Sequence, residues 1–176
     1  EMADAKVTEF ASMTFYKGTL CGKDTVVVRS GIGKVNAAIC AQILVDKFGV
    51  DTLINTGIAG SLDARIDIGD MVISTDAVHH DMDATIFGDA IGQVPRMDTR
   101  TFPADPHLVE LAVKANEKAN PQIHTFTGRV ASGDQFISSG EVKARIVENF
   151  QALCTEMEGA GIAHAAYLNK VSYVII

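Results

Sequence analysis

The sequence has no apolar run long enough to cross a membrane. A transmembrane helix needs roughly 18 or more consecutive apolar residues, and no hydrophobic stretch in the chain reaches that length. A charged start followed by an apolar run, the pattern of a secretory signal, is also missing. We therefore expect a soluble, cytoplasmic protein with no membrane partner.

Basic residues and cysteines are also scarce. Fifteen Lys and Arg face 22 Asp and Glu, which gives a net charge of −7, and the basic residues form no stripe. This pattern argues against nucleic-acid binding. Cys21, Cys40 and Cys154 are far apart, and no C-x-x-C spacing occurs. We expect reduced thiols that are buried as small side chains.

The hydrophobic content is sufficient for one core. With 47% hydrophobic residues among 176, residues 1–176 are expected to form a single domain without a linker. The chain opens on Glu1 rather than Met and closes on an apolar run, 172–176, that is typical of a buried strand. We expect the natural protein to extend further.

Hydrophobic periodicity predicts strands that alternate with helices. The predicted strands are 14–20 and 25–29, joined by a turn at 21–24, and then 53–55, 71–74, 128–131, 153–156 and 172–176. The predicted helices are 34–48, 106–118, 139–149 and 158–168. The first helix is expected to bury Val35, Ala38, Ile39, Gln42, Ile43 and Val45. This order indicates an α/β fold with a largely buried mixed sheet.

Three glycine-containing turns follow predicted strands, where open α/β sheets place their ligands. Residues 30–34 resemble a nucleotide-binding loop but lack the full fingerprint, so a tight strand-to-helix turn explains them equally well. In residues 55–60 the small side chains would let a ligand approach the backbone, and a purely structural turn is the alternative. In residues 132–136, Phe136 is either a stacking surface for a planar base or a core residue.

Acidic and histidine clusters are the other candidates. Glu156 and Glu158 flank a methionine where a strand runs into a helix, so they could hold a sugar diol or be solvated acids at a helix start. Residues 79–83 contain His and Asp, but no distant ligand cluster matches them, and we predict no metal site. His164 is interpreted as an interior histidine.

Taken together, these motifs resemble the methylthioadenosine/S-adenosylhomocysteine nucleosidases, a family of the purine nucleoside phosphorylase and nucleosidase superfamily. The motifs, in the order and spacing of that family, are Ser30-Gly-Ile-Gly-Lys-Val-Asn36, Asn55-Thr-Gly-Ile-Ala-Gly60, His80-Asp-Met-Asp-Ala-Thr-Ile-Phe-Gly88, Gly92-Gln-Val-Pro95, Ser132-Gly-Asp-Gln-Phe-Ile137 and Glu156-Met-Glu158. The resemblance runs from about residue 15 to the last residue. It implies a three-layer αβα fold, phosphorylase/hydrolase-like, around a central mixed, twisted sheet.

The resemblance also implies a homodimeric hydrolase of methionine salvage that uses no cofactor and releases adenine from 5'-thio-substituted adenosines. Phe136 would stack on adenine, the Ile137 backbone would read the base edge, and Met157 with Glu158 would hold the ribose. Gly60 would line the sugar and water site, near which Ile58 replaces a serine that some members carry. Ile32 would contact the 5'-alkylthio group, and Phe87 and Pro95 of the partner subunit would close that apolar pocket.

The catalytic groups of the family are not in this sequence. The resemblance places the catalytic Glu after a strand that precedes Glu1, and the catalytic Asp after the strand that ends at Ile176. Residues 1–176 are therefore expected to turn over no substrate. Two alternatives stay open: a phosphorolytic relative, for which Arg29 and Lys34 are the candidate phosphate ligands, and a nucleoside-binding module without catalysis.

Overall fold

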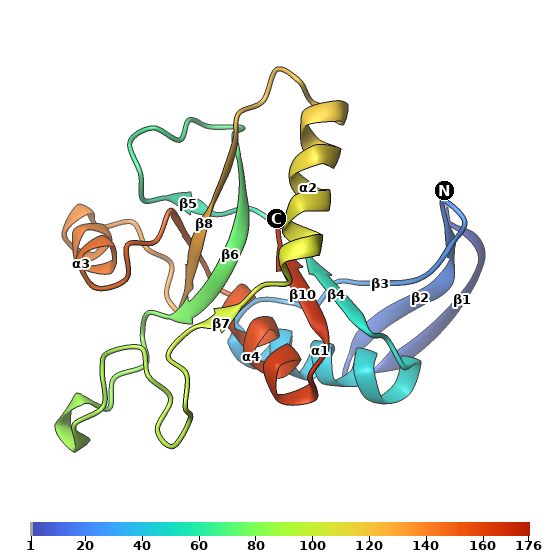
Figure 1. The fold of residues 1–176 in the computed structure, drawn as a ribbon. Coiled ribbons are helices and arrows are strands. Elements are labelled where there is room, and N and C mark those ends of the chain that lie inside the picture. The colour runs from blue at the N-terminus through green and yellow to red at the C-terminus, as the bar shows by residue number, and fades with distance from the viewer. Residues whose placement is uncertain (1) are drawn as a thin grey trace.

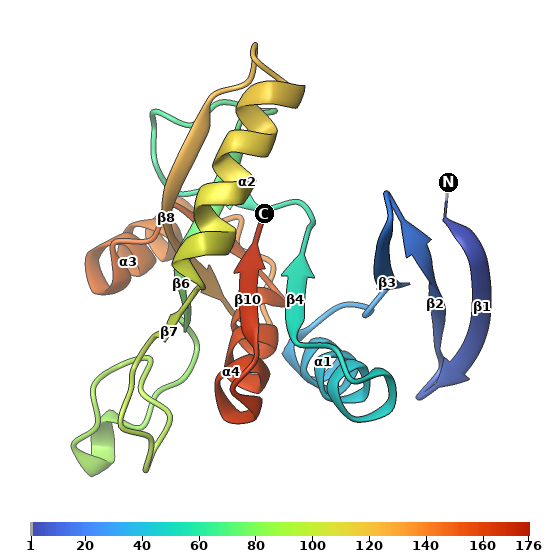
Figure 2. The same cartoon turned by 45° about the vertical axis from the view of Figure 1, so that its right-hand side comes forward.

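The structure is a computed structural model that describes residues 2–176. It is an α/β structure in which a small outer sheet flanks a helix-covered body (Figures 1 and 2). The hydrogen-bonded strands fall into sheets of three, two and five strands in the described residues. None of the helices in residues 2–176 is long and apolar enough to cross a bilayer.

The outer sheet is an antiparallel ribbon of β1 (Ala3–Phe10), β2 (Met13–Leu20) and β3 (Lys23–Val28). The predicted hairpin of β2 and β3 is confirmed. Its turn has only two residues, Cys21 and Gly22, both with positive φ, as a tight hairpin with the right-handed strand twist requires. The prediction missed β1 because nearly all of its side chains are exposed and give no buried alternation to read.

A second pair of strands, β4 (Thr52–Asn55) and β10 (Ser172–Ile175), runs parallel. Both were predicted as buried strands. The pair is tied to the larger sheet by the Ile175 N–H, which donates to the Ser74 Oγ at 2.9 Å.

The largest sheet is mixed, as predicted. Its order is β5 (Gly60–Ser61), β9 (Cys154–Glu156), β8 (Thr125–Ser132), β6 (Met71–His79) and β7 (Phe102–Pro103), with three parallel central strands and antiparallel edges. The predicted strand ended at residue 74 because the polar Thr75 and Asp76 interrupt its apolar run, whereas β6 continues to His79. Asp76 remains in the strand because Arg129 on β8 pairs with its carboxylate, with 2.6 Å between Nε and Oδ1.

The four predicted helices all form, with bounds within two residues of those predicted: α1 (Lys34–Phe48), α2 (Pro106–Ala119), α3 (Gly140–Phe150) and α4 (Gly159–Asn169). α3 and α4 cover opposite faces of the five-stranded sheet. Ala77 of β6 packs in the cluster that contains Ala163 of α4, whereas its neighbour Val78 packs with Ile146 of α3. Since successive strand residues point to opposite faces, this packing makes three layers.

The predicted buried face of α1 is wrong. The residues with the lowest exposure are Ala37, Cys40 and Ala41, whereas Val35 is 68% exposed and Ile39 is 42% exposed. α1 packs so closely on α4 that a Cβ added to Gly161 would lie 2.7 Å from the Lys34 carbonyl oxygen. Only small side chains fit between helices at this separation, whereas the larger Ile43 and Phe48 pack toward the outer sheet in the cluster of Met13 and Phe15.

Candidate active site

The glycine turns follow β3, β4 and β8, as predicted. One hydrogen bond joins the first turn to the third, from the Lys34 N–H to the Asp134 Oδ1 at 2.8 Å, and another joins it to the start of α4, from the Gly33 N–H to the Glu158 Oε1 at 2.7 Å. The second turn approaches through Gly60, which pairs with Thr155 of β9. Segments that are far apart in the sequence therefore meet at one place.

The amino end of α1 carries two carboxylates of the protein itself. Gly33 is the residue before the helix, with a φ of 93° that an L side chain rarely adopts. Glu158 and Asp134 accept the N–H groups of Gly33 and Lys34. The positive end of the helix dipole, a common place for a bound anion, is therefore already occupied by negative charge.

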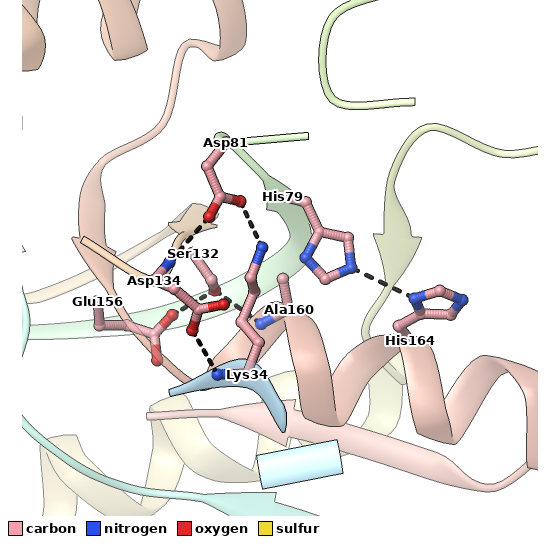
Figure 3. Close-up of polar contacts among 8 residues, drawn as sticks. All are labelled: Lys34, His79, Asp81, Ser132, Asp134, Glu156, Ala160 and His164. Atoms are coloured by element: carbon pink, nitrogen blue, oxygen red, sulfur yellow. Dashed lines mark hydrogen bonds and ion pairs between the residues drawn. The ribbon is translucent and has the colours of Figure 1, made fainter. Parts of the chain in front are cut away.

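Lys34, Asp81 and Asp134 form a closed triangle of contacts (Figure 3). The Lys34 Nζ donates to the Asp81 Oδ1, the Asp134 N–H donates to the Asp81 Oδ2 at 2.9 Å, and the Lys34 N–H donates to Asp134. Burial by itself would raise the pKa of Asp81, but the hydrogen bonds from Lys34 and Asp134 outweigh it and lower that pKa. Asp81 is therefore an ionised anchor.

Glu156 has a structural role. Its Oε2 accepts the N–H groups of Glu158 at 2.9 Å and Gly159 at 2.7 Å, and its Oε1 accepts the Ser132 hydroxyl. Ser132 Oγ in turn accepts the Ala160 N–H at 2.7 Å (Figure 3). Burial raises the pKa of Glu156. This carboxylate joins β8 to the first turn of α4, so the alternative of a solvated acid is wrong for Glu156.

Glu158 is the acidic residue that remains for a ligand. One of its oxygens accepts from Gly33, and the other makes no hydrogen bond within residues 2–176. Met157 lies beside it and is partly buried. The free oxygen has the chemistry to accept from a sugar hydroxyl.

Large apolar side chains around these turns are uncovered. Phe136 is 87% exposed, Ile32 74% and Ile58 97%. The core alternative for Phe136 is therefore wrong. Ile137, the next residue, is partly buried and packs against the cluster of Val78 and α3. Apolar residues exposed to this degree beside polar groups are typical of a ligand site.

Phe87 and Pro95 lie on the segment between β6 and β7, which projects from the body at the lower left of Figure 1. Phe87 ends the short helix η1 (Thr85–Phe87) and is 84% exposed, and Pro95 is also exposed. These two residues have no recorded contact with the glycine turns of the same chain.

His164 lies in the interior, as predicted, but the sequence did not indicate its partner. Its Nδ1 is 3.3 Å from the His79 Nε2 (Figure 3). Its ring also stacks on Phe102, with 4.7 Å between the ring centroids. Burial lowers the pKa of His79 from 6.5 to about 4 and also lowers that of His164. Both imidazoles are therefore neutral at pH 7.

The His and Asp residues of segment 79–83 are used in other ways than metal binding. Asp81 binds Lys34, His79 faces His164, and the His80 ring lies 2.4 Å from where a Cβ on Gly133 would be. In the described part of the chain, no group of three or more His, Cys, Asp or Glu side chains is arranged to hold a metal ion.

An open hollow of about 560 Å³ lies elsewhere, between the residues after β5 and helix α3. It is lined by Ser61, Leu62, Asp63, Ala64, Ile66, Lys143, Ala144, Val147 and Glu148. None of the turn residues that converge at the site contributes to it, so we do not assign it to the site.

Sequence reasoning did not identify the triangle of Lys34, Asp81 and Asp134. Lys34 was considered only as a phosphate ligand, and Asp81 only as a metal ligand. Nothing in the sequence indicates that a carboxylate next to a glycine turn contacts a lysine at the start of a helix. Their separations of 47 and 100 residues are bridged only by the fold.

Comparisons with known proteins agree with this arrangement. The model of the phosphorylase superfamily matches residues 2–176. A 5'-methylthioadenosine/S-adenosylhomocysteine nucleosidase of Treponema pallidum is 42% identical over 189 residues, covering 96% of this chain and 70% of the relative.

Solved structures are equally similar. The nucleosidase of the same name from Neisseria meningitidis, in complex with methylthio-immucillin-A, has a TM-score of 0.94 and 39% identity over 99% of this chain and 75% of its own. The nucleosidase from Colwellia psychrerythraea, in complex with adenine, has a TM-score of 0.93 and 43% identity over 99% of this chain and 72% of its own. From its turns, its mixed sheet and these relatives, the chain belongs to the phosphorylase superfamily.

Proposed function

We propose that this chain is the nucleoside-binding part of a hydrolase that cleaves the N-glycosidic bond of 5'-methylthioadenosine and S-adenosylhomocysteine. The products are adenine and a 5'-thio-substituted ribose, as in methionine salvage. Relatives that are 38 to 45% identical carry this name.

The roles follow the positions of the side chains. Phe136 offers an exposed ring on which adenine stacks, and the Ile137 backbone reads the base edge. Glu158 accepts from the ribose hydroxyls through its free oxygen, with Met157 beside it. Gly60 leaves space for the sugar and the attacking water, and the apolar Ile32 and Ile58 suit a thioether better than a free hydroxyl.

The single observation that favours hydrolysis over phosphorolysis is the occupied amino end of α1. A phosphorylase needs donors that converge on a phosphate. Here the N–H groups of Gly33 and Lys34 are bound by Glu158 and Asp134, and the Lys34 ammonium is paired with Asp81. A phosphate would have to displace three carboxylate contacts and approach their charge, which Coulomb repulsion opposes.

The chemistry requires an acid that protonates adenine and a base that directs water at the anomeric carbon. The family resemblance places both groups outside residues 1–176. We expect residues 1–176 alone to bind nucleoside weakly and to release no adenine. The activity belongs to the complete gene product, in the cytoplasm, where its free thiols remain reduced.

A homodimer completes the pocket in this proposal. Phe87 and Pro95 belong to the segment between β6 and β7, which extends from the body in Figure 1, and Phe87 is exposed. An exposed aromatic side chain on a projecting segment is typical of a surface that a partner covers. From a second copy, these two residues would cover the 5'-alkylthio group.

The test supplies the complete gene product with methylthioadenosine, with and without phosphate, and identifies the sugar released with adenine. We expect free methylthioribose at the same rate in both conditions. Sugar 1-phosphate that forms only with phosphate would assign a phosphorylase. No adenine in either condition would leave a nucleoside-binding module as the function.

A further inference from the structure

We propose that Lys34, Asp81 and Asp134 form a brace that positions the base-stacking Phe136, so that Lys34 and Asp81 are positioning residues of the site. The proposal rests on the proposed function for its kinetic consequences. Its structural consequence, an ordered turn after β8, is measurable without any activity.

The first argument is that the brace is closed. Each of the three residues contacts both others, through one ammonium, two backbone N–H groups and two carboxylates. The side chains of Lys34 and Asp81 are only 15% and 16% exposed, so the solvent screens their ion pair weakly. Charge-assisted hydrogen bonds of this kind are stronger than neutral ones.

The second argument concerns where the brace acts on the turn. It binds Asp134 through both its backbone N–H and its carboxylate. The preceding residue, Gly133, donates its N–H to the Glu156 carbonyl oxygen at 3.2 Å, and the His80 ring fills the space beside it. The start of the turn is therefore held at once from the segment that follows β6, from β9 and from α1.

The third argument is that, in residues 2–176, hydrogen bonds hold this turn only at its start, and that the next contact along the chain is the packing of Ile137 against the cluster of Val78 and α3. Within the described residues, no hydrogen bond is recorded for residues 135–138, and Phe136 itself is exposed. Phe136 lies between the anchored Asp134 and the packed Ile137, so the anchored start of the turn is one of the two contacts that decide where the ring lies. A ring that is already ordered loses less conformational entropy when adenine binds, so this preorganisation increases the affinity for adenine.

The kinetic experiment uses the complete gene product and the Asp81→Asn variant. The Lys34 ammonium and the Asp134 N–H bind different oxygens of Asp81, and asparagine has an oxygen at only one of these two positions. One of the two hydrogen bonds is therefore lost, and the turn loosens. We expect the KM for methylthioadenosine to rise about tenfold, with kcat within about twofold. A double-mutant cycle with Phe136→Ala then tests whether Asp81→Asn changes KM through the Phe136 ring. Asp81→Asn should have little further effect once the ring is absent.

The matched control is Asp76→Asn. Asp76 lies on β6, five residues before Asp81, and it also forms an ion pair, with Arg129, but that pair does not contact the turn. This variant should lose thermal stability and keep the wild-type KM. If both variants raise KM equally, or if Asp81→Asn and Phe136→Ala are additive, the brace does not act through the ring and the proposal is wrong.

Amide hydrogen exchange of Gly133 and Asp134, the two residues of this turn whose N–H groups are hydrogen-bonded, provides the readout that is independent of activity. We expect at least tenfold faster exchange in Asp81→Asn than in the wild type, with β6 and β8 unchanged. The measurement stands even when the wild type releases no adenine, which would refute the proposed function alone. Unchanged exchange would overturn the brace.

A second pair of variants covers the case in which Asp81→Asn fails to fold. Asp134→Ala removes the acceptor for the Lys34 N–H, whereas Asp134→Asn keeps an acceptor oxygen and the backbone N–H. Faster exchange in Asp134→Ala that is largely restored in Asp134→Asn supports the brace. Equal exchange in the two variants contradicts it.

Discussion

At the scale of single residues, the site is built from groups whose partners lie far away in the chain. Glu156 and Glu158 differ by two positions, yet one joins a strand to a helix and the other keeps a free oxygen. Their sequence environments are nearly the same. The difference arises because Ser132 of β8 lies next to one and Gly33 next to the other.

Phe136 gives the first prediction. Phe136→Ala in the complete gene product should weaken adenine binding by about tenfold to a hundredfold, because aromatic stacking on a base is worth roughly 1–3 kcal/mol. Calorimetric titration with adenine measures the loss. Phe136→Tyr keeps a stacking face and should stay within about threefold. Unchanged affinity in Phe136→Ala would remove the ring from the site.

His79 gives a prediction about pH. Its pKa is about 4 in the folded state and 6.5 ordinarily, so the unfolded chain binds the proton more readily. The stability that the neutral His79 ring contributes is fully present above pH 6.5 and is lost as the pH falls toward 4. His80 and His164, whose pKa values are also lowered, act in the same direction. Lys34, His164, Asp81 and Asp134 are the charged or titratable groups that influence His79.

The measurement is urea unfolding of the wild type and His79→Gln from pH 8 to pH 4. We expect the wild type to lose stability more steeply with falling pH than the variant. At pH 8 the difference between the two proteins reports only lost packing, which serves as the internal control. Parallel curves over the whole range would show that His79 is not a source of acid lability.

At the scale of elements, close packing between segments decides which side chains are tolerated. The turn after β8 can lie against β6 only because Gly133 has no side chain: an added Cβ would meet the His80 ring at 2.4 Å. The amino end of α3 is different. A Cβ on Gly140 would meet nothing within 4 Å.

This contrast predicts opposite effects for two substitutions of glycine by alanine. Gly133→Ala should lower the free energy of unfolding by about 1–3 kcal/mol, because overpacking forces the imidazole or the turn to move. Gly140→Ala should be neutral or stabilise by up to roughly 1 kcal/mol, because it restricts the unfolded chain. Urea unfolding at pH 7 measures both. Equal effects would show that the turn has space that the geometry does not indicate.

At the scale of the whole molecule, the proposed dimer makes a prediction about mixed subunits. Phe136→Ala and Phe87→Ala should each lower the activity of the complete gene product. When the two variants are unfolded together and refolded, half of the dimers are mixed, and each mixed dimer has one intact site. About a quarter of the wild-type activity should return, since a twofold dimer exchanges equivalent surfaces.

The control is the same mixing without unfolding, which leaves the parent dimers intact. If the refolded mixture is no more active than the average of the two variants, Phe87 does not act across subunits. Sedimentation of the wild type checks the dimer independently.

The sequence by itself predicted much of this protein because local signals agree with the fold. The glycine turns, the helix caps and the apolar runs marked four helices and most strands, since each depends on neighbours in the chain. The motif order indicated the family, and it supplied the residues that we propose for the ligand site. The exposed strand β1 and the short edge strands β5 and β7 were missed, because they bury too little to give a pattern.

Only the tertiary structure decided the rest. The outward face of α1, the role of Glu156, the histidine pair and the brace all depend on contacts between segments that are distant in sequence. The distance between two packed helices or the charge that meets a helix end is set by three-dimensional packing. Residue patterns along one segment carry no information about what lies across from it, so these features became visible only in the fold.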